Sequence, residues 1–201
     1  MPSPIGHSLA GLAVAWVADL VPGDRLWRAE PATASWYRRA GNGLSATCAL
    51  LAAAPDLDLL FTTHRTYTHS AGAVIVVGLC AALSSARRRA RPSHATRIAL
   101  MCAAAYASHL LLDWLGVDLY PPLGLQALWP FDSGWYISGL DLFRQTRREH
   151  LFTWPVLELN FFAVVQEAAI LVPIVVALWL VREKALAGLA PEETRRDHPP
   201  E

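Results

Sequence analysis

A short stretch of the chain, residues 55–70, concentrates side chains that bind metals. It holds the carboxylates Asp56 and Asp58 and the imidazoles His64 and His69, between two apolar runs. Carboxylate and imidazole together suit Zn, Mn or Fe. A charged Asp beside an apolar run is costly unless it is paired, coordinated or solvated. The stretch therefore predicts a metal site, and we expect the rest of the chain to bring further ligands to it.

Three more candidate ligands lie in distant parts of the chain. His109 and Asp113 are four residues apart, a spacing that puts both on one face of a helix. His7 stands near the start of the first apolar run. Ordinary structural roles are open for all of them: a helix-start histidine for His7 and a buried hydrogen-bonded pair for the other two. In the 55–70 stretch, the carboxylates could cap a helix and the histidines could be exposed.

Five apolar runs indicate the elements that must position these residues. Of the 201 residues, 54% are hydrophobic and only 17% are charged, which is typical of membrane proteins. The last run is long enough to cross about 30 Å of hydrocarbon, and the small residues of the others suit close helix contact. We expect an all-α, compact polytopic membrane bundle of about five apolar helices. The runs are residues 5–21, 44–61, 71–84, 98–116 and 161–181.

The connections suggest one domain with a cap. We expect a single domain at 1–184 and a disordered polar tail at 185–201. The connection 116–160 is rich in Pro and Trp, and such aromatics prefer the headgroup level, so it predicts an interfacial cap. An ordinary aromatic-rich loop is the alternative. The start of the chain lacks a basic segment and a clear cleavage site, so we do not expect a cleaved signal peptide. The three cysteines lie in apolar runs and are expected to be buried; they are Cys48, Cys80 and Cys102.

The basic residues predict an orientation. If all five runs cross the membrane, 13 of the 17 Lys and Arg residues fall on one side. Positive residues favour the cytoplasm, so the N-terminus is expected outside and the C-terminus inside a bacterial-type inner membrane. All seven candidate ligands then meet at the extracytoplasmic face. Seven exceed what one tetrahedral ion needs, which suggests one or two ions, with Zn the first expectation and Mn or Fe as alternatives. Lys and Arg equal Asp and Glu in number, so nothing indicates a nucleic-acid partner.

The order of these motifs resembles a family of membrane-bound, metal-dependent hydrolases, the YdjM-like inner-membrane proteins. The resemblance rests on G-H near the start, P-D-L-D, H-R-T-Y-T-H-S, S-H-L-L-L-D and L-W-P, and covers His7 to about Asp132. It implies that Arg65 and Thr68 support the ligands or touch the substrate. Leu59 stands where some relatives have histidine, so no ligand is expected there. The resemblance implies metal ligation by His7, Asp56, Asp58, His64, His69, His109 and Asp113.

A metal-dependent hydrolase is the leading functional hypothesis. A metal-activated water would attack an ester or phosphoester bond of a lipid-like or amphiphilic substrate held at the membrane. Asp58 or Glu167 would orient or deprotonate that water, and Arg65 would hold an anionic group. Glu167 could instead be a buried residue hydrogen-bonded to a neighbouring helix. Three cap residues could also contact substrate: Asp132, Asp141 and His150.

Two other classes of function remain open. One is a membrane scaffold or envelope-maintenance protein whose metal is structural, which a fully coordinated site would favour. The other is a metal or proton transporter, because intramembrane His and Asp also line ion paths. The inner halves of the runs are mostly apolar apart from Asp19, which counts against transport. His94 and His198 lie in polar segments and are expected to be solvated.

Overall fold

The computed structural model describes residues 1–21, 35–60 and 64–187, and these residues form an all-helical fold without β-strands, as predicted. Five longer helices are joined by one short helix and two 3₁₀ segments. The α-helices are α1 (Pro4–Leu20), α2 (Trp36–Ala40), α3 (Gly43–Ala53), α4 (Ala71–Arg87), α5 (Pro92–Leu115) and α6 (Trp154–Ala187). The 3₁₀ segments are η1 (Ala54–Leu60) and η2 (Tyr67–His69).

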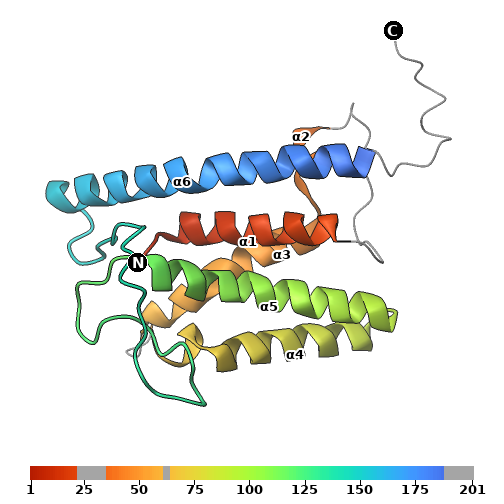
Figure 1. Ribbon diagram of the computed structural model, residues 1–201, viewed down its shortest axis with the longest axis horizontal. Helices are drawn as coiled ribbons and strands as arrows, with labels where there is room; N and C mark the ends of the chain where they lie inside the picture. Colours follow the sequence, from red (N-terminus) through yellow and green to blue (C-terminus); the bar gives the residue numbers. More distant parts are fainter. Residues whose placement is uncertain (22–34, 61–63, 188–201) are drawn as a thin grey trace, which may run out of the picture.

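The longer helices lie side by side, and each runs in the opposite direction to the one before it along the chain, including α6 after the cap (Figure 1). Helix α1 packs against α3, α5 and α6, and α4 packs against α5. The chain's N-terminus, the C-terminal end of α5 and the N-terminal ends of α4 and α6 gather at one end of the bundle (Figure 1). This end, which we call the cap end, also receives η1 and η2.

Two described helices, α5 and α6, are long and apolar enough to cross a membrane, which corrects the expected number of about five. Helices α1 and α4 have 17 residues each, a length of about 25 Å, against about 30 Å of hydrocarbon. Helix α3 has 11 residues. Its run continues as the 3₁₀ segment η1, because Pro55 has no N–H for an α-helical hydrogen bond.

Small residues allow α1 to approach α3 and α5 closely. Ala15, Cys48, Met101 and Ala105 form one buried cluster among these helices. A Cβ atom on Gly11 would lie 2.4 Å from the backbone oxygen of Cys48, so only glycine permits this contact. The prediction that the cysteines are buried holds for Cys48 and Cys102 but is wrong for Cys80, which lies exposed on α4.

The cap is an irregular segment, residues 116–153, that lies across one end of the bundle (Figure 1). Its carbonyls at Ala127 and Trp129 accept hydrogen bonds of 2.8 and 2.9 Å from the amides of Ala71 and Gly72. Those amides begin α4 and have no partner inside that helix, so the cap completes the helix end. Phe152 is 95% exposed.

The predicted boundaries of the cap and the tail differ slightly from those observed. Helix α6 begins at Trp154, so residues 154–160 are helical and do not belong to the cap. It also continues to Ala187, beyond the predicted end of the domain at 184. The rest of the predicted tail, 188–201, lies outside the described residues, as does His198. His94 is half-buried rather than fully solvated.

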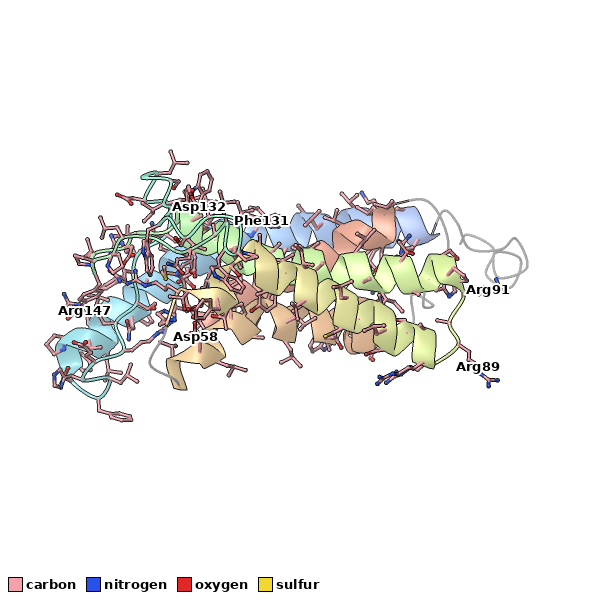
Figure 2. All side chains as sticks on the ribbon, turned by 90° about the horizontal axis from the view of Figure 1, so that it is seen from below. Asp58, Arg89, Arg91, Phe131, Asp132 and Arg147 are labelled. Carbon is pink, nitrogen blue, oxygen red and sulfur yellow. The ribbon has the colours of Figure 1, made fainter. Side chains whose placement is uncertain are left out.

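The opposite end of the bundle holds a buried ion pair. Arg182 of α6 is fully buried, and its Nε donates to Asp19 Oδ2 of α1 over 2.8 Å. Its Nη1 donates to the backbone oxygen of Arg39 in α2 over 2.8 Å, and its guanidinium lies over the ring of Trp16. Three helices are therefore joined at one polar point. The α4–α5 turn, with Arg89 and Arg91, lies at this same end (Figure 2).

Candidate metal centre

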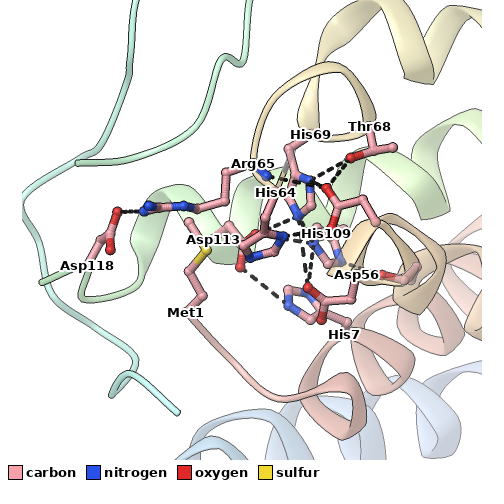
Figure 3. A network of polar contacts seen from close by, with 12 residues as sticks. Met1, His7, Asp56, His64, Arg65, Thr68, His69, His109, Asp113 and Asp118 are labelled. Atoms are coloured by element: carbon pink, nitrogen blue, oxygen red, sulfur yellow. Dashed lines mark hydrogen bonds and ion pairs between the residues drawn. The ribbon is translucent and has the colours of Figure 1, made fainter. Parts of the chain in front are cut away.

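The fold brings all seven predicted ligands to the cap end. His7 comes from the first turn of α1, and His109 and Asp113 come from the last turns of α5. Asp56 and Asp58 lie in η1, and His69 ends η2. Figure 3 shows side chains from these separate elements pointing toward one another: His7, Asp56, His69, His109 and Asp113. Four of them are fully buried: His7, His69, His109 and Asp113.

Five of the seven form an inner group around the Asp113 carboxylate. Asp113 Oδ2 lies 3.1 Å from His109 Nε2 and 3.5 Å from His69 Nε2. Asp113 Oδ1 lies 3.4 Å from His7 Nε2, and the Nε2 atoms of His69 and His109 are 3.0 Å apart. Two atoms that bind one ion at about 2.1 Å lie about 3 to 3.4 Å apart, so these spacings suit a shared ion. Asp56 Oδ1 is slightly farther, 3.9 and 4.0 Å from the same two histidines.

The hydrogen bonds of His69 and His109 turn their Nε2 atoms toward the inner group. His109 Nδ1 donates to the Ala52 carbonyl over 2.7 Å. His69 Nδ1 lies 3.1 Å from Asp58 Oδ2 and 2.9 Å from Thr68 Oγ1. This network assigns the proton of each ring to Nδ1, which leaves a lone pair on Nε2. Such bonds from carboxylates and carbonyls commonly orient metal-binding histidines.

Several buried atoms of the inner group have no hydrogen-bond partner among the described residues. They are both ring nitrogens of His7, both carboxylate oxygens of Asp113 and Oδ2 of Asp56. Buried polar atoms are nearly always hydrogen-bonded, and buried charges are paired or coordinate metals. A divalent cation would satisfy these atoms together, and a mixed His and Asp donor set suits Zn, Mn or Fe. The residues present therefore fit a metal.

Asp58 and His64 form an outer pair beside the inner group. Asp58 Oδ1 accepts from His64 Nδ1 over 2.7 Å, and Asp58 Oδ2 accepts from Thr68 Oγ1 over 2.5 Å. Burial raises the pKa of the Asp58 carboxyl, but hydrogen bonds from His64, His69 and Thr68 outweigh burial and hold the pKa well below its usual range. Asp58 is therefore ionised at neutral pH and orients both histidines. Asp58, His64 and His69 together form a group that could hold a second ion.

Glu167 lies away from this cluster. Its Oε1 accepts from the Ser3 amide over 2.8 Å, and its Oε2 accepts from Ser3 Oγ over 2.5 Å. Ser3 in turn accepts from the Gly6 amide as the N-cap of α1. Glu167 thus holds α6 to the start of α1, which is the alternative role considered for it. Its placement gives no support to the predicted catalytic role.

One comparison with known proteins is decisive. The model of the YdjM inner membrane protein family matches residues 1–187. The chain belongs to the YdjM inner membrane protein family. The match confirms the family suggested by the P-D-L-D and H-R-T-Y-T-H-S motifs. No curated protein and no solved structure matches the chain.

Arg65 of this YdjM-family protein points away from the inner group. Its guanidinium forms an ion pair with Asp118 of the cap and donates to the Tyr120 carbonyl over 3.1 Å (Figure 3). Only its backbone amide contacts the cluster, at 3.3 Å from Asp58 Oδ2. Arg65 thus joins the cap to the ligand segment, the stretch that carries Asp56, Asp58, His64 and His69. Its predicted role in holding an anion stays a prediction.

The sequence did not reveal that a second arginine reaches the ligand cluster, by which we mean the inner group and the outer pair together. Arg148 Nη2 donates to Asp56 Oδ1 over 3.1 Å, and Nη1 lies 3.4 Å from His64 Nε2. Arg147 and Arg148 are adjacent basic residues in the sequence, but basic residues alone predicted only the orientation of the chain in the membrane. The three other cap candidates are exposed on the surface and have no described contact with the cluster: Asp132, Asp141 and His150.

Proposed function

We propose that this YdjM-family protein is a metal-dependent hydrolase of the inner membrane that cleaves an ester or phosphoester bond in an amphiphilic substrate. The observation that carries the proposal is the buried group of His and Asp atoms without hydrogen-bond partners, beside a cavity. A metal-dependent hydrolase needs both a metal site and room for substrate next to it.

The inner group would hold the ion, and a divalent cation supplies a water of lowered pKa and a charge that polarises the substrate oxygen. The outer pair would handle the proton. The bond from His64 Nδ1 to Asp58 orients the ring, so that Nε2 lies toward Arg148 and the cavity. His64 Nε2 is therefore the atom that would accept a proton from the reacting water, and the Asp58 carboxylate would stabilise the imidazolium.

The experiment compares purified protein in detergent with and without Zn, Mn or Fe, on water-soluble carboxylic esters and phosphoesters. We expect hydrolysis that requires metal, and we expect His69→Ala to lower it at least 100-fold because one ligand is lost. Arg91→Gln, at the far end of the bundle, is the control and should keep full activity. Hydrolysis that survives both metal removal and His69→Ala would refute the mechanism.

A structural metal site in a membrane scaffold is the second candidate. The full burial of His7, His69, His109 and Asp113 favours it, because structural sites are closed. Tight metal binding without hydrolysis of any substrate in the panel would support this alternative over the enzyme.

The orientation remains part of the proposal. The ligand cluster and the cap lie at the end opposite Arg89 and Arg91 (Figure 2), and under the positive-inside rule this supports a site on the extracytoplasmic side. Phe152→Cys in a Cys80→Ser background leaves Cys48 and Cys102 buried and adds one exposed cysteine, which should react with an impermeant thiol reagent in intact spheroplasts. Reaction only after the spheroplasts are lysed would reverse the orientation.

A further inference from the structure

A cavity of about 240 Å³ adjoins the ligand cluster. It lies between the ligand segment, which contributes His64 and Arg65, and the cap, which contributes Arg147 and Arg148. Asp118 and Glu149 also line it. Three guanidinium groups against two carboxylates leave one positive charge in excess, without counting the imidazole.

The charged groups that line the cavity differ in how far they are paired with described residues. Asp118 is already paired with Arg65. Arg147 is exposed, and its guanidinium forms no ion pair with any described residue. Arg148 donates to one carboxylate, Asp56, although a guanidinium carries five N–H donors. The cap side of the cavity therefore offers donors and positive charge to an anion.

The rest of the wall is partly apolar. Leu59 and Tyr120 line the cavity and are 41% and 46% exposed. Leu57, on the same 3₁₀ segment as Leu59, is 62% exposed. A ligand with an anionic head and an apolar chain would match both parts of this surface.

Arg148 links the cavity to the candidate metal ligands. One of its Nη atoms lies 3.1 Å from Asp56 Oδ1 and the other 3.4 Å from His64 Nε2. An anion bound by this guanidinium would sit directly beside Asp56 and His64. Guanidinium groups bind phosphate by paired hydrogen bonds that match its planar geometry.

We propose that this cavity is a phosphate-binding subsite and that Arg148 holds the phosphate group next to Asp56 and His64. The proposal rests on the hydrolase function and deepens it, since it names a phosphate-bearing amphiphile as the substrate class. It also moves the anion-holding role from Arg65, as predicted from the sequence, to Arg148.

The test measures binding rather than turnover. Detergent-purified protein is titrated calorimetrically with inorganic phosphate and with dihexanoyl phosphatidic acid, with hexanoate as the carboxylate control. We expect both phosphates to bind more tightly than hexanoate, and Arg148→Gln to weaken both by about tenfold or more. Arg148→Lys should retain part of the affinity, because it keeps the charge but loses the paired geometry.

Arg144→Gln is the matched control, because Arg144 is exposed in the same segment but does not line the cavity. It should bind phosphate as the parent does. A lower unfolding temperature in Arg148→Gln would raise the concern of misfolding, and the lysine variant then decides. Tighter binding of phosphatidic acid than of phosphate would support a lipid source with the chain on Leu59 and Tyr120. Equal binding would support recognition of the phosphate group alone.

The subsite and the hydrolase can fail separately. Phosphate affinity that is unchanged in both Arg148 variants, or absent in the parent, would overturn the subsite even if metal-dependent hydrolysis is found. Phosphate binding that depends on Arg148 in a protein without any hydrolysis would uphold the subsite and overturn the hydrolase.

Discussion

Replacing His109 with Ala and Asp113 with Asn together is expected to remove the metal from this protein. The Asp113 carboxylate lies within 3.5 Å of three histidines, and both of its oxygens lack hydrogen bonds among the described residues. The variant therefore deletes two of the five inner candidate ligands, including the one that all three histidines share. We expect metal content to fall from at least one equivalent to below about a tenth, measured by mass spectrometry after purification in detergent.

Stability gives this prediction a second readout. A ligand that binds only the folded state at 100 times its Kd stabilises the protein by about 2.7 kcal/mol. Added metal should therefore raise the unfolding temperature of the parent and leave the double variant unchanged. Ser108→Ala is the control, because Ser108 lies on the same helix and its hydroxyl donates only to the Ala105 carbonyl. A double variant that keeps its metal would show that the ion binds elsewhere.

Arg182→Met is expected to destabilise the protein by about 3 to 5 kcal/mol, the usual cost of leaving a buried charge without its partner. The stranded group would be Asp19, which is 5% exposed. Asp19→Leu should also destabilise the protein, because it removes the carboxylate to which the fully buried guanidinium donates through Nε. Chemical unfolding in a fixed detergent, followed by circular dichroism, measures both.

The double variant separates the ion pair from general packing. Asp19→Leu with Arg182→Met removes both charges and should recover most of the lost stability, since an apolar pair often replaces a buried ion pair well. Thr47→Val is the control, because Thr47 is exposed and its hydroxyl donates to the Gly43 carbonyl of its own helix, and such surface substitutions change stability by about 0.5 kcal/mol or less. Additive losses in the double variant would contradict the assignment.

The ligand cluster could be predicted from the sequence because the types and the spacing of its residues are themselves informative. The four-residue spacing of His109 and Asp113 defines a helix face, and two carboxylates and two histidines crowd one short stretch. Metal ligands are restricted to a few residue types, so a concentration of them is informative before any fold is known. The helical class was equally visible in the apolar runs.

The remaining features depend on contacts that no local pattern contains. Arg148 reaches Asp56 across 92 residues from an irregular cap, and its neighbours Arg144 and Arg147 look the same in sequence. Glu167 lies in an apolar helix as a catalytic base might, and only its bond to Ser3 reveals its role. The sequence predicts too many spanning helices, because hydropathy shows neither that α1 and α4 end after 17 residues nor where η1 replaces α3.

Helix α6 supplies no side chain to the ligand cluster, yet its longitudinal register is fixed at two points. Ser3 and Asp19 lie 16 residues apart on α1, and their partners Glu167 and Arg182 lie 15 residues apart on α6. The two helices run in the same direction (Figure 1), so both pairs align at once over about 24 Å. Sliding by one turn, about 5.4 Å, would break both pairs together. A helix long and apolar enough to cross a membrane is thereby prevented from sliding along the one that carries His7.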